Sequence, residues 1–567
     1  MKKICIFIFA LLCTNAYAQL LVNGKNVFFD AETRTLLATV PKSLFGHDAA
    51  LPVEIMPGWQ DVTIDSQQPV ADTPFLFSQL SAERKWPVKA TKADGSTLEA
   101  TLQFTFLPIV QLLPSAAEGF SSVYQQAALV YSQPESAATD TLTARIKWRG
   151  GTTNTPDKHK RNYKVNFDTD QRFFGLRNDD KWMLDAGQPD VFRLRNRIAM
   201  DLWNKMARKP YYADQEPKAL NGVRGDVVEL FLGDEWRGIY NLSEFIDRKQ
   251  LKLKKIDSQT GEIRGCLYKG VSWNKVQMFD YFDSYDNTKD TFHGYEFKYP
   301  ELGDDSDTVD WAPFVEANNF VNKSTDKDFQ EHIDEYVDMP VLTDYHIFFN
   351  VVNALDNAGK NMYWAVYDKT ASRRITPAPW DLDATFGQRW GGRLVYEVVE
   401  GLTISPEFRM DFELMLTNRM FEHNFNDYLG QLNERYRQLR QPGQPLHTDS
   451  ILALVEGYYT SVKNSGAASR EEAKWSGDSD VWGDVIDFDT EYAYICDWIC
   501  RRMEFIDQSG LPMFYTKSYF DELSVNLPSR DIGNDSEIYT LSGLRVKNTA
   551  NLQPGIYIKK GKKVVIK

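Results

Sequence analysis

The chain carries the stretch Asn353-Ala-Leu-Asp-Asn-Ala-Gly-Lys-Asn-Met-Tyr-Trp364, and a second stretch, Pro379-Trp-Asp-Leu-Asp-Ala-Thr-Phe-Gly387, follows it closely. In the first stretch Asp356 stands five positions before Asn361, and the second stretch contributes Asp381. Carboxylate and amide oxygens are the hard ligands from which proteins build Mg²⁺ sites. A buried carboxylate is also costly unless it is paired or ligated. The two stretches therefore predict a site for a divalent cation.

The order of these groups matches what phosphoryl transfer needs. A carboxylate must stand near the accepting hydroxyl, and separate oxygen ligands must hold the metal. In protein kinases these roles fall to an aspartate, an asparagine five positions later and a further aspartate directly before Phe-Gly. Asp356, Asn361 and Asp381 follow that order, although the residues around them differ from those of ordinary protein kinases.

The pattern around these residues predicts how they come together. Apolar residues at helical spacing predict a buried helix over residues 342–355, which ends just before Asp356. Residues 362–367 and 374–378 predict a β-hairpin, and Asp381 falls where its second strand ends. A helix, a loop and a hairpin in this order place two acidic positions on opposite sides of a short β-pair. That arrangement suits one metal site.

The first residues have the pattern of a secretory signal. Lys2 and Lys3 precede the apolar run 4–13, and Ala-Tyr-Ala at 16–18 offers a cleavage site before Gln19. No later stretch is apolar enough to span a bilayer. We therefore expect residues 1–18 to be removed from an exported protein, whose destination is the periplasm, the cell surface or the extracellular space.

Composition narrows the class of protein. Hydrophobic residues make up 43% of the chain and charged residues 25%, as in folded soluble proteins. A net charge of −14 argues against a nucleic-acid partner, which needs Lys/Arg stripes. After cleavage Cys266, Cys496 and Cys500 remain, without the second ligand pair of a zinc site. Cys496 and Cys500 share a helical spacing that favours packing over a disulfide.

Two further β-rich regions flank the central part. Residues 19–113 contain short β-prone runs separated by Gly, Pro, Asp and Asn, which predicts an immunoglobulin-like β-sandwich. They hold no cluster of reactive residues, so an accessory role is expected. Residues 529–567 predict a small C-terminal β module, either a simple terminal sheet or a sorting or attachment module. The pattern over about residues 407–506 predicts a largely helical region.

A lysine-bearing hairpin is the candidate for phosphate binding. An alternating strand ends in Gly150-Gly151, and a second alternating strand puts Lys160, Asn162, Lys164 and Asn166 on one face. Such a hairpin suits a phosphate lid, but a Gly-Gly turn is also common without that role. Glu244, after a second hairpin, either holds a catalytic lysine or lies in the capping region of a helix.

These segments together resemble the CotH kinase family, which comprises secreted or spore-coat proteins with an atypical kinase-like fold. The resemblance covers roughly residues 120–510. It implies an α+β fold: a kinase-like domain over residues 114–520, preceded by the β-sandwich and followed by the β tail. Four segments carry it: Arg149–Thr153 with Lys160–Phe167, then Leu232–Glu244, Asn353–Asn361 and Pro379–Gly387.

The resemblance also implies roles for the site residues. ATP would be the phosphate donor, with Mg²⁺ or Mn²⁺ as the metal. Asp356 would act as the base for the acceptor hydroxyl. Lys160 or Lys164 would contact the phosphates, and Glu244 belongs to the nucleotide side of the site. The metal ligands would be Asn361, Asp381 and Asp383, of which Asp383 supports Asp381 or binds a second ion.

The chain departs from the family pattern at three positions. Gly151 stands where Asn is usual, and Arg161 and Asn162 also differ. These changes affect the phosphate-binding hairpin and leave the metal-binding stretches intact.

Two functions from different classes fit the sequence. The first is an exported ATP- and Mg²⁺-dependent kinase that phosphorylates Ser/Thr of a protein substrate. The alternative is a catalytically inactive, kinase-like surface protein that binds a glycan or a partner protein. A glycosidase with two carboxylates would leave the spacing of Asn361 unexplained.

Overall fold

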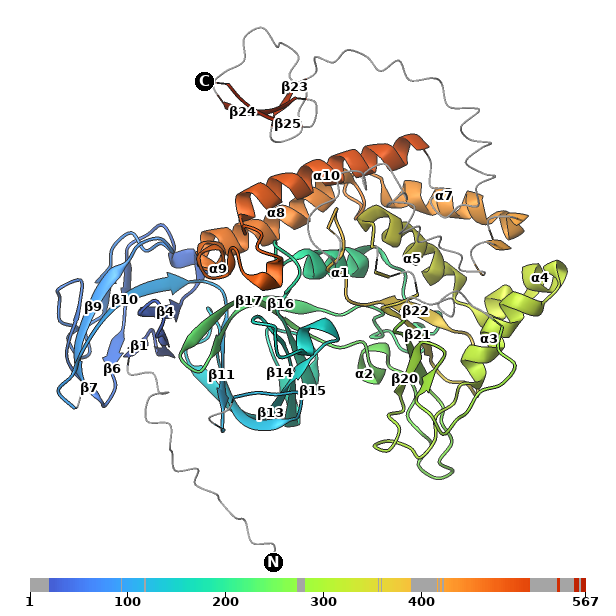
Figure 1. The fold of residues 1–567 in the computed structure, drawn as a ribbon, viewed down its shortest axis with the longest axis horizontal. Helices are drawn as coiled ribbons and strands as arrows, with labels where there is room; N and C mark the ends of the chain where they lie inside the picture. Colours follow the sequence, from blue (N-terminus) through green and yellow to red (C-terminus); the bar gives the residue numbers. More distant parts are fainter. Residues whose placement is uncertain are drawn as a thin grey trace, which may run out of the picture. The chain divides into compact units, whose positions relative to one another are not determined.

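The chain is a mixed α+β protein, with strands dominating its N-terminal part and helices its C-terminal part, as predicted (Figure 1). The predicted signal segment lies outside the residues that the structure describes. The structure is a computed structural model that describes residues 20–92, 94–116, 119–272, 281–354, 356–357, 359–388, 416, 419–420, 423–509, 538–540, 555–559 and 562–566.

The chain divides into two compact units, each assembled from separate segments. The first unit is built from Met1–Gln188, Asp226–Leu242 and Thr460–Ser476. The second unit is built from Pro189–Gly225, Ser243–Tyr459 and Gly477–Lys567.

The first unit begins with a β-rich module, as the turn-rich sequence predicted. Ten strands form three sheets, in the orders β2-β1-β6, β3-β4-β10-β9-β7 and β5-β8. The alternation along β9 buries Trp86, Val88 and Ala90 in one shared core. The strands are β1 (Leu20–Val22), β2 (Lys25–Asn26), β3 (Phe28–Asp30), β4 (Thr35–Thr39), β5 (Ala49–Leu51), β6 (Val53–Ile55), β7 (Trp59–Ile64), β8 (Phe75–Phe77), β9 (Trp86–Lys92) and β10 (Thr97–Thr105).

A closed barrel follows in the same unit (Figure 1). Its order is β11-β12-β13-β14-β15-β17-β16, and β11 pairs in parallel with β16 to close it. Tyr163, Val165 and Phe167 of β14 point into the core, so Asn162 and Lys164 lie on the outer face, as the alternation predicted. The strands are β11 (Ile109–Pro114), β12 (Gln125–Ser132), β13 (Thr139–Arg149), β14 (Asn162–Arg172), β15 (Asn178–Asp185), β16 (Gly225–Leu232) and β17 (Glu235–Ser243).

A helix from late in the chain, α9 (Ala467–Trp475), completes the first unit. Its Glu471 is fully buried and accepts hydrogen bonds from Lys160 Nζ at 2.9 Å and from the backbone N–H of Ile239 at 2.7 Å. Lys160 also donates to the Ile239 carbonyl at 2.7 Å and lies 4.6 Å from the centroid of the Tyr240 ring. Because buried charges must be paired, this ion pair fixes α9 against the barrel.

Gly238 provides the space that Glu471 occupies. Its φ is +106°, and a Cβ at this position would lie 2.1 Å from Glu471 Oε2 and 3.0 Å from Trp475 Nε1. Any other residue would therefore combine a strained backbone with a displaced carboxylate.

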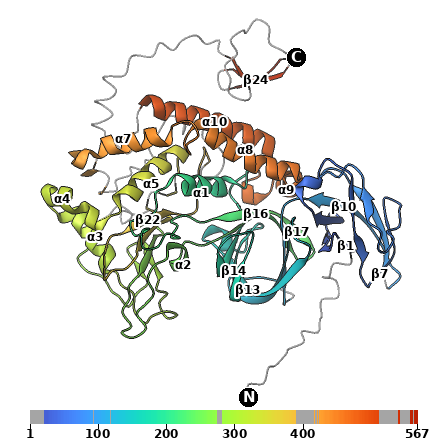
Figure 2. The ribbon, with the colours of Figure 1, turned by 180° about the vertical axis from the view of Figure 1, so that it is seen from behind.

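The second unit is built around the sheet β19-β20-β18-β21-β22 and a central helix, α5 (Met339–Val352). Nearly every residue of α5 is buried, and the helix lies beside β22 in both views (Figures 1 and 2). The remaining elements of this sheet and its helices are β18 (Cys266–Gly270), β19 (Thr291–Phe292), β20 (Tyr295–Tyr299), β21 (Met362–Val366), β22 (Thr376–Pro379), α1 (Arg195–Met206), α2 (Arg248–Leu251), α3 (Ala312–Lys323), α4 (Asp326–Tyr336), α7 (Tyr428–Leu439) and α10 (Phe488–Ser509).

Neighbouring helices hold α5 in place. The Trp203 ring of α1 packs edge-on against Tyr345 and Phe348, with centroids 5.8 and 5.3 Å apart. Arg502 of α10 donates two hydrogen bonds to the carbonyl of Asn350, in the last turn of α5. The end of α5, and the loop that follows it, are therefore fixed from two sides. A further long helix, α8 (Thr448–Asn464), leads into α9.

The C-terminal β pattern is also present. Strands β23 (Ile538–Thr540), β24 (Gly555–Lys559) and β25 (Lys562–Ile566) form an antiparallel sheet. Among the residues that the structure describes, no helix has the length and apolarity to cross a membrane.

The three cysteines beyond the predicted signal are free thiols. Burial raises the pKa of the Cys266 thiol to about 12 and that of Cys496 to about 11. The prediction that Cys496 and Cys500 pack without a disulfide is confirmed.

The fit between Gly238 and Glu471 can be tested by substitution. We expect Gly238→Ala to lower the free energy of unfolding by about 3 kcal/mol, because strain and overpacking add. Gly233→Ala is the matched control, since Gly233 lies in the turn of the same hairpin, at φ +60° with no atom within 4 Å of its added Cβ. Its cost should be about 1 kcal/mol. If urea denaturation shows that Gly238→Ala and Gly233→Ala lose the same free energy of unfolding, the predicted clash is contradicted.

Candidate functional site

The loop after α5 is held to the end of β22. Asn353 caps α5 in the left-handed conformation, with φ 51°, so the helix ends there and not at the predicted residue 355. Asn357 donates a side-chain hydrogen bond to the carbonyl of Trp380, and Tyr345 OH donates to the carbonyl of Asn357 at 2.6 Å. These bonds tie together the two stretches of sequence that carry the predicted metal ligands.

Asp356 lies in this loop with 6% of its surface exposed. Lys360 Nζ is 2.9 Å from both carboxylate oxygens of Asp356, and Asn361 Nδ2 donates to Asp356 Oδ2 at 2.8 Å. Asn361 is itself buried, and its backbone N–H donates to the carbonyl of Gly270 at 2.9 Å. An amide that donates through Nδ2 keeps Oδ1 as its acceptor, and that oxygen is the atom with which asparagine binds a cation.

The surroundings of Asp356 change its acidity. The pKa of Asp356 is raised to about 6, and burial is the largest cause. The positive charge of Lys360 opposes this rise, and that of Lys269 opposes it more weakly. The negative charge of Asp381 adds to the rise. The charge of Asp381 therefore acts on Asp356 directly, across the end of the hairpin. A bound cation would favour ionisation of both carboxyl groups.

Asp381 and Asp383 follow β22 on an irregular segment. Asp381 is exposed, with φ 60°, and Asp383 is half-buried. Between them the buried Leu382 donates its backbone N–H to Asn196 Oδ1 at 3.0 Å, and this bond anchors the segment to α1. The segment thus has a fixed backbone while it keeps one carboxylate open to solvent.

The far end of this segment is also anchored. The backbone N–H of Phe386 donates to the carbonyl of Val352, and Tyr494 OH donates to the carbonyl of Gly387 at 3.2 Å. A Cβ at Gly387 would lie 2.4 Å from Tyr494 OH, so the glycine permits α10 to approach.

Three residues of the site were not predicted from sequence. Lys360 stands directly before Asn361, so its position in the quoted stretch could have suggested a contact with Asp356. Lys269 and Gly270 come from β18, whose pairing with β21 no local pattern reveals. Gly270 is needed there because a Cβ would lie 1.9 Å from the carbonyl oxygen of Gly359.

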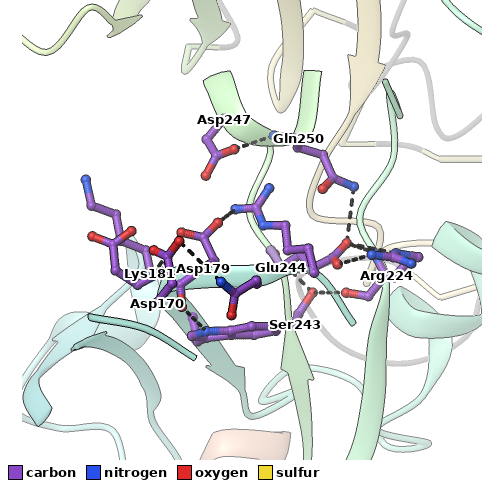
Figure 3. Close-up of polar contacts among 12 residues, drawn as sticks. Asp170, Asp179, Lys181, Arg224, Ser243, Glu244, Asp247 and Gln250 are labelled. Atoms are coloured by element: carbon purple, nitrogen blue, oxygen red, sulfur yellow. Dashed lines mark hydrogen bonds and ion pairs between the residues drawn. The ribbon is translucent and has the colours of Figure 1, made fainter. Parts of the chain in front are cut away.

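The residues predicted for nucleotide binding lie in different environments. Lys160 is fully buried and paired with Glu471 of α9, so the prediction that it shares one strand face with Lys164 is wrong. Lys164 is half-buried on the outer face of β14, which begins only at Asn162. Glu244 belongs to the second unit, where it is fully buried and accepts hydrogen bonds from Arg224 Nη2 at 2.7 Å and from Gln250 Nε2 at 3.2 Å (Figure 3).

The capping role considered for Glu244 falls to another residue. The helix that follows, α2, has Asp247 as its N-cap, and Asp247 Oδ1 accepts the backbone N–H of Gln250 at 2.8 Å (Figure 3). Glu244 instead fixes Arg224, whose backbone N–H and guanidinium group both donate to its carboxylate.

A second acidic group lies in the first unit. Asp170, Asp179 and Asp180 offer carboxylate oxygens within 4.8 Å of one another. Arg177 forms an ion pair with Asp179, and Asn178 donates to Asp170, so this group is partly compensated by its own neighbours. It contains none of the residues predicted to bind metal.

The raised pKa of Asp356 gives a pH-dependent stability. The folded protein holds the proton more tightly than the unfolded chain, so this stabilisation is present below pH 4 and is lost as pH rises through 6. In EDTA, the free energy of unfolding of wild type should fall by about 3 kcal/mol relative to that of Asp356→Asn between pH 4 and pH 8. Urea denaturation at a series of pH values measures this. The control is Asp334→Asn, a substitution at an exposed position of α4. If the difference in free energy of unfolding between wild type and Asp356→Asn does not vary with pH, the pKa of Asp356 is not raised.

Comparison with known protein families gives a match whose range includes the residues of the candidate site. A search of curated proteins found no match. The family described as CotH kinase protein matches residues 146–506, which include the barrel strand β14, the Asp356 loop and the segment after β22. Because this match covers most of the chain, the protein belongs to the CotH kinase family.

Proposed function

We propose that the protein is an exported protein kinase that uses ATP and Mg²⁺ to phosphorylate Ser or Thr of a protein substrate. One observation carries the proposal: Asp356 is hydrogen-bonded to Asn361 at 2.8 Å and is acted on by the charge of Asp381. These three residue types, in this order, are the base and the metal ligands of the phosphoryl-transfer template.

The residues fit a divalent cation. Asn361 Oδ1 and the exposed carboxylate of Asp381 would be ligands, and Asp383 would support Asp381 or bind a second ion. Bound Mg²⁺ would neutralise the charge of the nucleotide phosphates and align them. Mn²⁺ has the same ligand preference and could replace Mg²⁺.

Asp356 is the residue we assign to the acceptor hydroxyl. Its carboxylate would accept a hydrogen bond from the Ser or Thr hydroxyl and orient it for in-line attack. In the structure both oxygens of Asp356 are engaged by Lys360. Each carboxylate oxygen can accept more than one hydrogen bond, so the hydroxyl could donate to Asp356 beside Lys360, and negatively charged phosphates would draw Lys360 away from it.

The buried ion pair between Lys160 and Glu471 is a second feature that supports the proposal. Protein kinases depend on a lysine–glutamate ion pair at the nucleotide site. The buried pair of Lys160 and Glu471, 2.9 Å apart, provides a pair of this kind within the barrel unit. Its glutamate comes from α9, and not from the Glu244 position considered from the sequence.

The base assignment predicts a separation of binding from transfer. Asp356→Asn should keep nucleotide binding and lower phosphate transfer at least 100-fold, because the amide cannot accept the hydroxyl proton. Transfer of radiolabel from ATP to the protein itself and to a Ser/Thr-rich acceptor, with Mg²⁺ or with EDTA, measures this. Wild-type rates in this variant would show that Asp356 is not the base.

The metal assignment predicts a different phenotype for Asp381→Asn. MgATP should raise the melting temperature of wild type, since a ligand that binds the folded state stabilises it. Asp381→Asn should lose this rise, because the metal loses its exposed carboxylate ligand. Asp334→Asn should retain it. Stabilisation by a glycan but not by MgATP, in the wild type, would favour an inactive binding protein over the kinase.

A further inference from the structure

Two side chains hold the carboxylate of Asp356, and they do so unequally. Lys360 Nζ lies 2.9 Å from each of its oxygens, whereas Asn361 Nδ2 donates to Oδ2 alone, at 2.8 Å. A carboxylate oxygen has two lone pairs that can accept hydrogen bonds. Among the residues that the structure describes, Oδ2 thus has two donors and Oδ1 has one. Oδ1 is therefore the oxygen with the capacity to accept a further hydrogen bond.

The backbone on both sides of Lys360 is fixed by strand β18. Gly359 precedes Lys360 with a φ of +98°, and its carbonyl oxygen is so close to Gly270 that a Cβ there would lie 1.9 Å from it. Asn361 follows Lys360, and its backbone N–H donates to the carbonyl of Gly270 at 2.9 Å. Only the torsions of the Lys360 side chain must therefore be ordered to keep Nζ on Asp356.

The ion pair of Lys360 and Asp356 is largely shielded from solvent. The side chain of Asp356 is 8% exposed and that of Lys360 is 28% exposed. Removing one partner of a shielded pair leaves the other charge uncompensated, which disturbs a protein far more than the loss of an exposed pair. Without Lys360, the carboxylate would be held by Asn361 at one oxygen only. It would then be free to turn about its Cβ–Cγ bond.

We infer that Lys360 is a positioning residue for phosphate transfer, which orients Asp356 so that Oδ1 receives the hydroxyl of the acceptor. In the transfer, the acceptor oxygen forms a bond to the γ-phosphorus of ATP, and the bond from that phosphorus to the bridging oxygen breaks, with its electron pair leaving on ADP. The hydroxyl proton passes to Oδ1. The pull of bound phosphates on Lys360 acts in the same sense, because a weaker bond to Oδ1 frees that oxygen further while Asn361 still holds Oδ2. This role rests on the proposed function.

The first test separates turnover from nucleotide binding. With MgATP and a Ser/Thr-rich acceptor, Lys360→Met should lower kcat at least tenfold and change the KM for ATP less than twofold, because the base is misoriented while the nucleotide site is intact. The matched control is Lys369→Met, which removes a similarly shielded lysine, paired with Asp310 in the same unit, and should leave kcat unchanged. An unchanged kcat in Lys360→Met would overturn the inference. A tenfold rise in its KM for ATP would also overturn it, since that result assigns Lys360 to the phosphates.

Graded substitutions separate this role from a loss of folding. Lys360→Arg should restore kcat to within threefold of wild type, because a guanidinium group can donate to both carboxylate oxygens. Lys360→Gln, which donates without a charge, should have a kcat between those of Lys360→Arg and Lys360→Met. Lys360→Met and Lys369→Met should show a similar fall in melting temperature, since each leaves a shielded carboxylate unpaired. If Lys360→Met does not fold, Lys360→Gln takes its place in the comparison. A kcat that is equally low in every folded Lys360 variant would contradict the positioning role.

A double-mutant cycle shows whether Lys360 acts through Asp356. In Asp356→Asn the carboxylate is gone, so the addition of Lys360→Met should lower the residual rate less than twofold. A further tenfold loss would mean that Lys360 acts on another group, and would refute the positioning role. The kinase proposal fails separately. If wild type transfers no phosphate with Mg²⁺, that proposal is refuted and this role with it, whereas transfer at the same kcat by wild type and Lys360→Met refutes the role of Lys360 alone.

Discussion

The buried carboxylate of Glu471 is the constraint on which the first unit depends. A charge with no access to water must be matched, and Lys160 and the backbone N–H of Ile239 match it. The same helix adds a second pair, in which the guanidinium group of Arg470 donates to both oxygens of the buried Glu229. The barrel is therefore complete only when α9 supplies these groups. Gly238 follows from the same constraint, because a side chain there would displace the carboxylate.

In the second unit, the carboxylate of Asp356 is also buried and needs compensating contacts. The loop that carries this carboxylate is held in place because Asn357 ties it to the end of β22 and Tyr345 of α5 donates to the carbonyl of Asn357. The pKa of Asp356 is raised by burial and by Asp381, which is the electrostatic condition for a group that exchanges protons or meets a cation.

Local patterns in the sequence were sufficient for much of the fold. Alternation predicted which face of β14 is buried, helical spacing predicted α5, and two strand-like runs predicted the hairpin of β21 and β22 that follows it. The helix end was misplaced because Asn353 adopts a left-handed conformation that apolar spacing does not reveal. Closure of the barrel, the contribution of Lys269 and the partner of Lys160 could not be predicted. Each depends on pairing between distant segments, and Lys160 and Glu471 are 311 residues apart.

The late position of α9 has a consequence for how the chain matures. Synthesis proceeds from the N-terminus, so the barrel strands emerge long before residues 467–475. Contacts between segments so far apart in sequence form slowly, because a long loop must close first. Throughout that interval Lys160 lacks the carboxylate of Glu471, with which it pairs in the folded protein. The barrel strands are thus translated early but reach their final state only after residues 467–475 have been made, and a chain that terminates before them would leave Lys160 without its partner.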